Sequence, residues 1–296
     1  MEKKTRKFRV GFMVDNNQLS INEYKVYEHV INSPEFDNPI FLTGYLKNRP
    51  SRNKKEILIN HLKNLNFIKA INLYFYLLLS KIIQFFELKE VQKRFPSFLD
   101  RKLVDAKGEN FFKVNGIWSK SGLNITLDES SILKIKKLNL DVIVLFGGGI
   151  IKGDILRLPK FGVLNFHHGD NRINRGGPVG FWEVFNSEKT SGFIIQKLNE
   201  ELDGGLVLCR GNIRTSSLWL VNKYNLIFKS TFFMQKILSD LAKNKVNFEK
   251  NLYLYDNQLL KHNDDSKLLL RRKNGLRQTP GSILSIEKPP DKELLI

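Results

Sequence analysis

The chain is poor in cysteine, and this shortage limits both its chemistry and its cellular compartment. Its 296 residues include one cysteine, Cys209. A single thiol excludes an intramolecular disulfide framework and a cysteine-cluster metal site. Cys209 lies in the apolar run LVLC, which predicts a buried core thiol. The composition suits a reducing compartment, and we expect a cytoplasmic protein.

Long uninterrupted hydrophobic runs are also missing. The most hydrophobic window, residues 67–86, is interrupted by Lys69, Asn72, Lys81 and Gln84. Such interruptions argue against a membrane-spanning helix and favour a buried or interfacial helix. The basic start of the chain has no apolar stretch before Asp15 long enough for a signal peptide.

Acidic residues are scarce relative to basic ones. The chain has 48 Lys and Arg against 30 Asp and Glu, a formal net charge of +18. Such an excess concentrates anionic partners such as nucleotides, nucleic acid or an acidic bilayer surface. The lysines are also spread along the whole chain among many Asn and Ile residues, as in proteins encoded by AT-rich genomes. Both explanations of the charge stay open.

Apolar segments alternate with helical patterns, which predicts an α/β protein of one large domain, alone or with an appendage. Expected strands cover residues 8–14, 40–42, 140–146, 163–167, 193–198 and 206–208, and expected helices cover 22–31, much of 54–88, and 218–243. The run at 140–146 is continuously apolar, as in a strand covered on both faces. The first strand is not followed by GxGxxG, so the usual dinucleotide-binding fingerprint is absent.

The most informative polar pattern is the segment GVLNFHHGDNRINRGGPVGFWEV, residues 162–184. Asn165 and His167 are two residues apart on an expected strand, so both side chains project from the same face. An amide beside an imidazole can polarise a carbonyl and move a proton. Asp203, on an Asp-Gly turn downstream, can tune that imidazole. Each feature alone has a plain structural explanation, a satisfied polar pair or a hairpin turn.

The combination resembles the catalytic core of the folate-dependent formyltransferases, the superfamily of methionyl-tRNA, glycinamide-ribonucleotide and nucleotide-sugar formyltransferases. Its members carry Asn-x-His, then Arg-Gly, a Thr-Gly strand and a late Asp-x-Gly. The matching residues here are Asn165 and His167, Arg175-Gly176, Ser191-Gly192 and Asp203-Gly204-Gly205. The resemblance covers about residues 138–207, together with residues 8–15 as a first strand. The fuller form HHGD…NRGGPxGFWEV is similar to a less studied branch associated with activated sugars.

The chain departs from the common family motif on the acceptor side. Where the family has Pro-Ser after its histidine, this chain has His168-Gly169-Asp170, and Asn174 replaces a frequent aromatic residue. These departures affect the identity of the substrate more than the reaction.

The resemblance implies a Rossmann-like formyltransferase core with a largely helical insertion and a small C-terminal extension. The catalytic domain would span 1–245 with an inserted elaboration at about 50–137, and the extension would span 246–296. The formyl donor would be 10-formyltetrahydrofolate, and no metal constellation is visible. The implied residues are Asn165, His167 and Asp203 for catalysis; Phe146, Gly147, Gly148, Gly149, Ile150, Glu200, Glu201 and Leu202 for the donor; and His168, Asp170 and Arg175 for the acceptor.

The leading interpretation is an N-formyltransferase that acts on a small phosphorylated amine, such as a nucleotide-linked amino sugar. A methionyl-tRNA formyltransferase is the nearest alternative, although that family carries a sizeable C-terminal domain and only about fifty residues follow the last long helix here. A non-catalytic basic protein that binds nucleic acid or a membrane surface would explain the charge but not the motif. We expect no stable nucleic-acid partner, while a peripheral membrane contact, the oligomeric state and the acceptor stay open.

Overall fold

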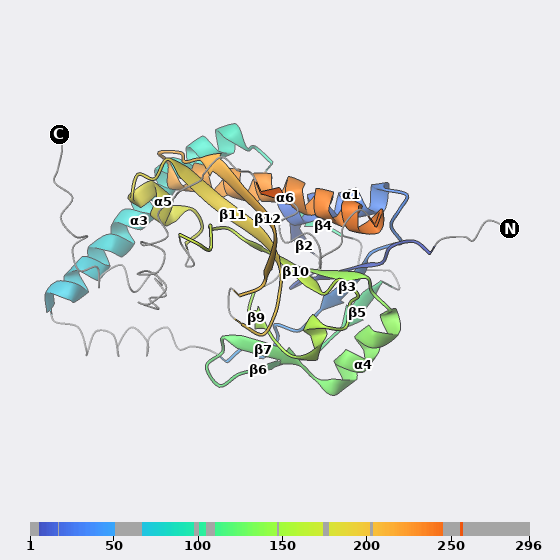
Figure 1. The fold of residues 1–296 in the computed structure, drawn as a ribbon. Helices are drawn as coiled ribbons and strands as arrows, with labels where there is room; N and C mark the ends of the chain where they lie inside the picture. Colours follow the sequence, from blue (N-terminus) through green and yellow to red (C-terminus); the bar gives the residue numbers. More distant parts are fainter. Residues whose placement is uncertain are drawn as a thin grey trace.

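The computed structural model describes residues 6–16, 18–50, 67–97, 101–104, 110–146, 148–173, 178–201, 204–244 and 255–256. Its centre is a mixed eight-stranded sheet (Figure 1). The strand order is β13 (Tyr255–Asp256), β12 (Leu206–Arg214), β11 (Thr190–Lys197), β10 (Val163–His167), β8 (Val142–Leu145), β1 (Val10–Met13), β3 (Ile40–Thr43) and β5 (Phe111–Lys113). The expected α/β fold is confirmed.

The middle of the sheet is parallel, from β10 through β8, β1 and β3 to β5. All residues of β1 and β8 are buried, which explains their continuous apolar sequences. On the other side of β10, β11 and β12 form an antiparallel pair. Ligands of such sheets bind beyond the carboxyl ends of the parallel strands, which is where the Asn165–His167 motif lies.

Helices cover both faces of this sheet. Helices α1 (Ile21–Asn32) and α6 (Trp219–Ala242) lie side by side on one face, and α4 (Glu129–Leu138) lies on the other (Figure 1). Two separate hydrophobic clusters form as a result. Cys209 has no exposed surface and belongs to the first cluster, which confirms the predicted core thiol.

Part of the segment interpreted as an insertion is integral to the body of the protein. Strand β5 pairs with β3 at the edge of the main sheet, and α4 leads directly into β8. A second sheet joins β6 (Gly116–Trp118) and β7 (Asn124–Leu127) to β9 (Ile150–Ile151). These strands have two to four residues each, which is too short for a recognisable alternation of polar and apolar residues. A third sheet pairs β2 (Gln18–Ser20) with β4 (Arg101–Leu103).

The helix expected near residues 54–88 is present as α3 (Phe67–Arg94), while residues 51–66 lie outside the described ranges. The second half of α3 is anchored to the first turn of α6. The Glu87 carboxylate accepts hydrogen bonds from the backbone N–H groups of Trp219 (3.0 Å) and Leu220 (2.5 Å). This contact satisfies two N–H groups that lack partners within α6. Among the described helices, none is long and apolar enough to cross a membrane.

Two short helices complete the described elements, the 3-10 helix η1 (Asp154–Leu156) and α5 (Phe181–Phe185). Of the expected C-terminal extension, the structure describes β13, which pairs in parallel with β12. The other residues of 246–296 lie outside the described ranges.

Candidate active site

Asn165 and His167 lie at the carboxyl end of β10 on one face of the sheet, as strand alternation predicts. In the antiparallel pairing with β11, Asn165 is opposite Gln196 and His167 is opposite Ile194. Directly opposed residues project from the same face, so Asn165 and Gln196 are neighbouring amides. Strands β10 and β11 therefore present an imidazole and two amides on one face.

Two amide oxygens in this cluster are buried without a hydrogen-bond donor among the described residues. They are Oδ1 of Asn165 and Oε1 of Gln196, and Gln196 is only 2% exposed. An unsatisfied buried polar group costs about 1–3 kcal/mol, so such groups commonly mark the place of a ligand or an ordered water. Gln196 was not predicted from sequence, because only the strand register reveals that it faces Asn165.

The glycine loop after β8 leaves room beside the sheet. Gly147 lies outside the described residues, but a Cβ on Gly148 would meet no atom within 4 Å. Gly149 has a φ of +94°, a conformation that glycine adopts without strain. Ile150 begins β9, whose pairing with β7 fixes the far end of the loop. The backbone can therefore approach a ligand closely at Gly148.

Phe146 precedes this loop, and both its backbone N–H and its ring contact other residues of the protein. Its backbone N–H donates to the Met13 carbonyl (3.0 Å). Its ring stacks between those of Phe12 and Phe166, with centroids 5.3 Å and 6.1 Å away. The N–H group and the ring of Phe146 are therefore engaged within the protein.

Glu200, predicted to contact the donor, joins the turn after β11 to the segment that follows β9. Its carboxylate accepts from the Gly153 N–H (3.1 Å), and its carbonyl accepts from Nζ of Lys152 (3.0 Å). The turn after β11 thus lies against Lys152 and Gly153, two and three residues beyond the predicted donor loop at 146–150. The Glu200 side chain holds the two segments together, which differs from a direct ligand contact.

Asn199 forms hydrogen bonds with Glu201 and Gly204, the described residues on either side of Leu202 and Asp203. The Glu201 N–H donates to Oδ1 of Asn199 (3.0 Å), and Nδ2 of Asn199 donates to the Gly204 carbonyl (2.9 Å). Leu202 and Asp203 lie outside the described residues, as does Arg175. Their catalytic, donor-binding and acceptor-binding roles stay predictions.

His168, predicted to contact the acceptor, is a structural residue in this fold. Its Nε2 is 3.0 Å from Oγ of Ser230 on α6, and the Ser230 hydroxyl is 2.9 Å from the Ile227 carbonyl. Because the single hydroxyl hydrogen donates to that carbonyl, Nε2 of His168 donates to the Ser230 oxygen, and burial keeps the ring neutral. Burial, followed by the charges of His167 and Lys223, lowers the pKa of His168 to about 3.

This environment makes the stability of the fold sensitive to pH. The unfolded chain protonates His168 near its ordinary pKa of about 6.5, whereas the folded chain resists protonation down to about 3. The contribution to stability is complete above about pH 6.5 and falls as the pH drops toward 3, by on the order of a few kcal/mol. We expect denaturant titrations to show a smaller loss between pH 7 and pH 5 for His168→Gln than for the wild type. Equal losses would contradict the neutral role of His168.

Asp170, predicted to hold an amine, is instead the counter-ion of two arginines. It is 3% exposed and accepts from Nη2 of Arg172 (2.8 Å) and from Nη1 of Arg210. Burial alone would raise the pKa of Asp170, but the Arg172 hydrogen bond and the Arg210 charge outweigh it and hold the pKa below its ordinary value. Nη2 of Arg210 also donates to Oδ1 of Asn171 (3.0 Å). The contacts of Arg210 with Asp170 and Asn171 therefore hold the loop after His168 against β12.

Gly192 permits the loop that contains Asp170 to approach β11 closely. A Cβ on Gly192 would lie 2.7 Å from Cβ of Asp170 and 3.2 Å from its backbone nitrogen. Any other residue would push the loop away from β11, which gives a physical reason for the glycine in the Ser191-Gly192 match. Arg210 was missed by sequence reasoning, although an arginine inside an apolar strand is a signal of a buried ion pair.

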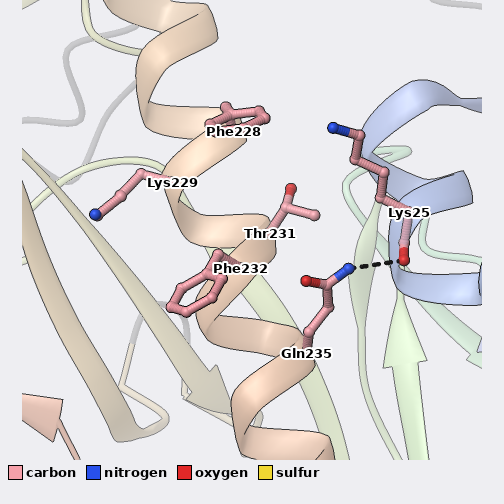
Figure 2. Close-up of a pocket in the computed structure, with 6 residues that line it drawn as sticks. All are labelled: Lys25, Phe228, Lys229, Thr231, Phe232 and Gln235. Carbon is pink, nitrogen blue, oxygen red and sulfur yellow. Dashed lines mark hydrogen bonds between the residues drawn. The ribbon is translucent and has the colours of Figure 1, made fainter. Parts of the chain in front are cut away.

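A separate groove lies between α1 and α6 (Figure 2). It has a volume of about 290 Å³ and is lined by Lys25, Phe228, Lys229, Thr231, Phe232 and Gln235. It contains none of the predicted site residues. Among the described residues, no group of three or more His, Cys, Asp or Glu side chains could hold a metal ion.

Comparisons with known proteins point to one superfamily. No protein-family model matches the chain. The chain is 31% identical over 118 residues to the bifunctional polymyxin resistance protein ArnA of Wigglesworthia glossinidia brevipalpis, which covers 38% of this chain and 18% of that protein. It is 26% identical over 201 residues to the methionyl-tRNA formyltransferase of Malacoplasma penetrans, covering 62% and 58% of the two chains. The chain thus spans less than two thirds of these curated relatives.

Solved structures with similar folds carry related names. A phosphoribosylglycinamide formyltransferase from Anaplasma phagocytophilum superposes with a TM-score of 0.48 at 11% identity, covering 85% of this chain and 100% of that one. A sugar N-formyltransferase from a Shewanella species has a TM-score of 0.42 at 14% identity, covering 90% and 88%.

Proposed function

We propose that this chain, which belongs to the formyltransferase superfamily, transfers a formyl group from 10-formyltetrahydrofolate to the amine of a small phosphorylated acceptor. The observation that carries the proposal is the cluster at the end of β10. There His167 lies beside Asn165, and the buried amide oxygens of Asn165 and Gln196 accept from no described residue.

The cluster suits acyl transfer to an amine. The acceptor's own nitrogen is the nucleophile, so no protein nucleophile is required. When bound, 10-formyltetrahydrofolate would supply the activated formyl group. Asn165 can donate an amide N–H to the formyl oxygen as negative charge develops there. Its amide group would turn so that the nitrogen, and not Oδ1, faces that oxygen. His167 can accept the proton that the attacking nitrogen loses and return it to the donor nitrogen as the bond from that nitrogen to the formyl carbon breaks. Asp203 would favour the charged form of His167, as the resemblance implies.

The region beside the cluster fits the donor. Gly148 leaves open space next to backbone groups, and Glu200 holds the turn after β11 to Gly153, a few residues beyond this loop. We expect 5-formyltetrahydrofolate, a stable analogue, to bind with micromolar affinity in calorimetry. Gly148→Leu should weaken this binding at least about tenfold because the leucine would fill that space, and the melting temperature should stay within about two degrees. Absence of folate binding by the folded wild type would contradict the donor assignment.

Charge around the acceptor loop supports a phosphorylated acceptor. Arg172 and Arg210 together outnumber the single carboxylate of Asp170. Lys223 of α6 is half-buried, and burial lowers its pKa. Among the described residues, no acidic side chain contributes to this shift. A loop with excess positive charge favours anionic groups such as phosphate or diphosphate. Asp170 neutralises part of this charge and is too buried to bind the amine, so the amine would be held elsewhere.

A second candidate is formylation of methionyl-tRNA, favoured by the 201-residue match to an enzyme of that name. We expect mass spectrometry to detect the formylated product with a nucleotide-linked amino sugar, in a panel that also contains glycinamide ribonucleotide and methionyl-tRNA. Exclusive formylation of methionyl-tRNA, with affinity that falls by orders of magnitude as salt rises, would favour the second candidate. No product with any acceptor, despite folate binding, would contradict transfer to these amines.

A further inference from the structure

Helix α3 carries large apolar side chains on its surface. Leu78, Ile82, Ile83, Phe85 and Phe86 are 42–65% exposed, and the two phenylalanines are the most exposed of the five. Leu78, Ile82, Phe85 and Phe86 follow the spacing i, i+4, i+7, i+8, which places them along one side of a helix. Exposed aromatic and aliphatic side chains gathered on one element mark an interaction surface.

The protein holds this surface away from its core. The second half of α3 is fixed to α6 by Glu87 and by Val91, which has no exposed surface and packs in a cluster with Leu220 and Val221. The amino-terminal end of α3 extends away from the main sheet (Figure 1). The apolar side chains are therefore carried on an anchored helix and not on a mobile loop.

The polar residues of α3 give this surface a positive charge. Lys81, Lys89 and Lys93 are exposed, and Nζ of Lys89 lies 5.3 Å from the centre of the Phe85 ring. The two acidic residues between them add little negative charge to the outside. Glu87 is buried as the cap of α6, and Glu90 is paired with Arg94 at 2.6 Å.

We propose that α3 docks this protein on the surface of an anionic lipid bilayer. An apolar strip flanked by lysines is the pattern of helices that lie in the interface, with the apolar residues among the acyl chains and the cations at the headgroups. Charge favours an anionic bilayer over a second copy of the chain as the partner of α3. A second copy would bring lysines against lysines on molecules that each carry +18. The described part of α3 is not apolar enough to cross a bilayer, so the helix would lie on it.

The test is flotation of the full-length protein with lipid vesicles. We expect the wild type to float with vesicles of phosphatidylcholine and phosphatidylglycerol in equal parts and not with phosphatidylcholine alone. Raising the salt from about 0.1 M to about 0.5 M should weaken binding several-fold by screening the lysines. The double substitution Phe85→Ser, Phe86→Ser should reduce the bound fraction at least tenfold.

A matched control is the pair Phe228 and Phe232 of α6, which are also exposed, lie one turn apart and have Lys25 and Lys229 beside them (Figure 2). Phe228→Ser, Phe232→Ser should float like the wild type. Equal losses in both double variants, or undiminished flotation of the α3 variant, would overturn the proposal. So would a wild-type dimer in analytical ultracentrifugation that the α3 substitutions convert to a monomer. None of these outcomes depends on formyl transfer, which the α3 variant should retain if the proposed function is correct.

Discussion

Replacing His167 or Asn165 with alanine should abolish most formyl transfer and leave the fold intact. Loss of one oxyanion donor in acyl-transfer sites lowers the rate by about 10²–10³, and loss of a general base lowers it by about 10²–10⁴. Both side chains lie at the end of β10 and are only partly buried, so truncation removes little packing. The measurement is kcat in single-turnover and steady-state assays with the acceptor found in the panel, alongside melting temperature.

The adjacent histidine provides the control. His168 is bonded to Ser230 and is neutral, so His168→Gln should change stability and its pH dependence more than kcat. The double variant of Asn165 and His167 should lose far less than the product of the single losses, because the two groups act on the same reaction step. Near-wild-type turnover of His167→Ala with the correct acceptor would contradict the mechanism.

Much of the fold could be predicted because the relevant signals are local. The apolar runs at β1, β8 and β10 and the periodicity of α6 indicated these elements within a few residues of their observed bounds. Strand alternation placed Asn165 and His167 on the same face without knowledge of the sheet. Strands β5, β6 and β7 were missed because three or four residues are too few to show a periodic pattern.

The parts of the site that were missed depend on register between distant segments. Gln196 meets Asn165 only because β10 and β11 pair with that offset. Arg210 reaches Asp170 because β11 and β12 pair in a register that places Arg210 opposite Ile194, two residues from Gly192, which faces Asp170. Asp170 was predicted to contact the acceptor because it lies in a polar loop. The sequence alone does not show that a buried arginine forty residues away pairs with it.

Arg210→Met should therefore be the most destabilising of the substitutions considered near the site. Arg210 and Asp170 each have side chains only 4% exposed, and removal of one partner leaves a buried charge that has lost its closest counter-ion. Breaking such pairs costs about 3–5 kcal/mol, and the remaining contact with Arg172 places the expected loss near the lower end, at about 3 kcal/mol. Because the pair holds the loop that begins at His168, the variant should also raise the KM for the acceptor while donor affinity stays close to that of the wild type.

The control for this variant is Arg214→Met at the exposed end of the same strand, which should change stability by no more than about 0.5 kcal/mol. Asp170→Asn combined with Arg210→Met should be less destabilising than the sum of the single changes, because the double variant no longer contains the unpaired carboxylate. Urea titrations of the wild type, the three single variants and the double variant measure these differences directly. A loss for Arg210→Met within about 1 kcal/mol of the Arg214→Met value would show that the ion pair does not hold the loop, and additive single losses would show that the two residues act independently.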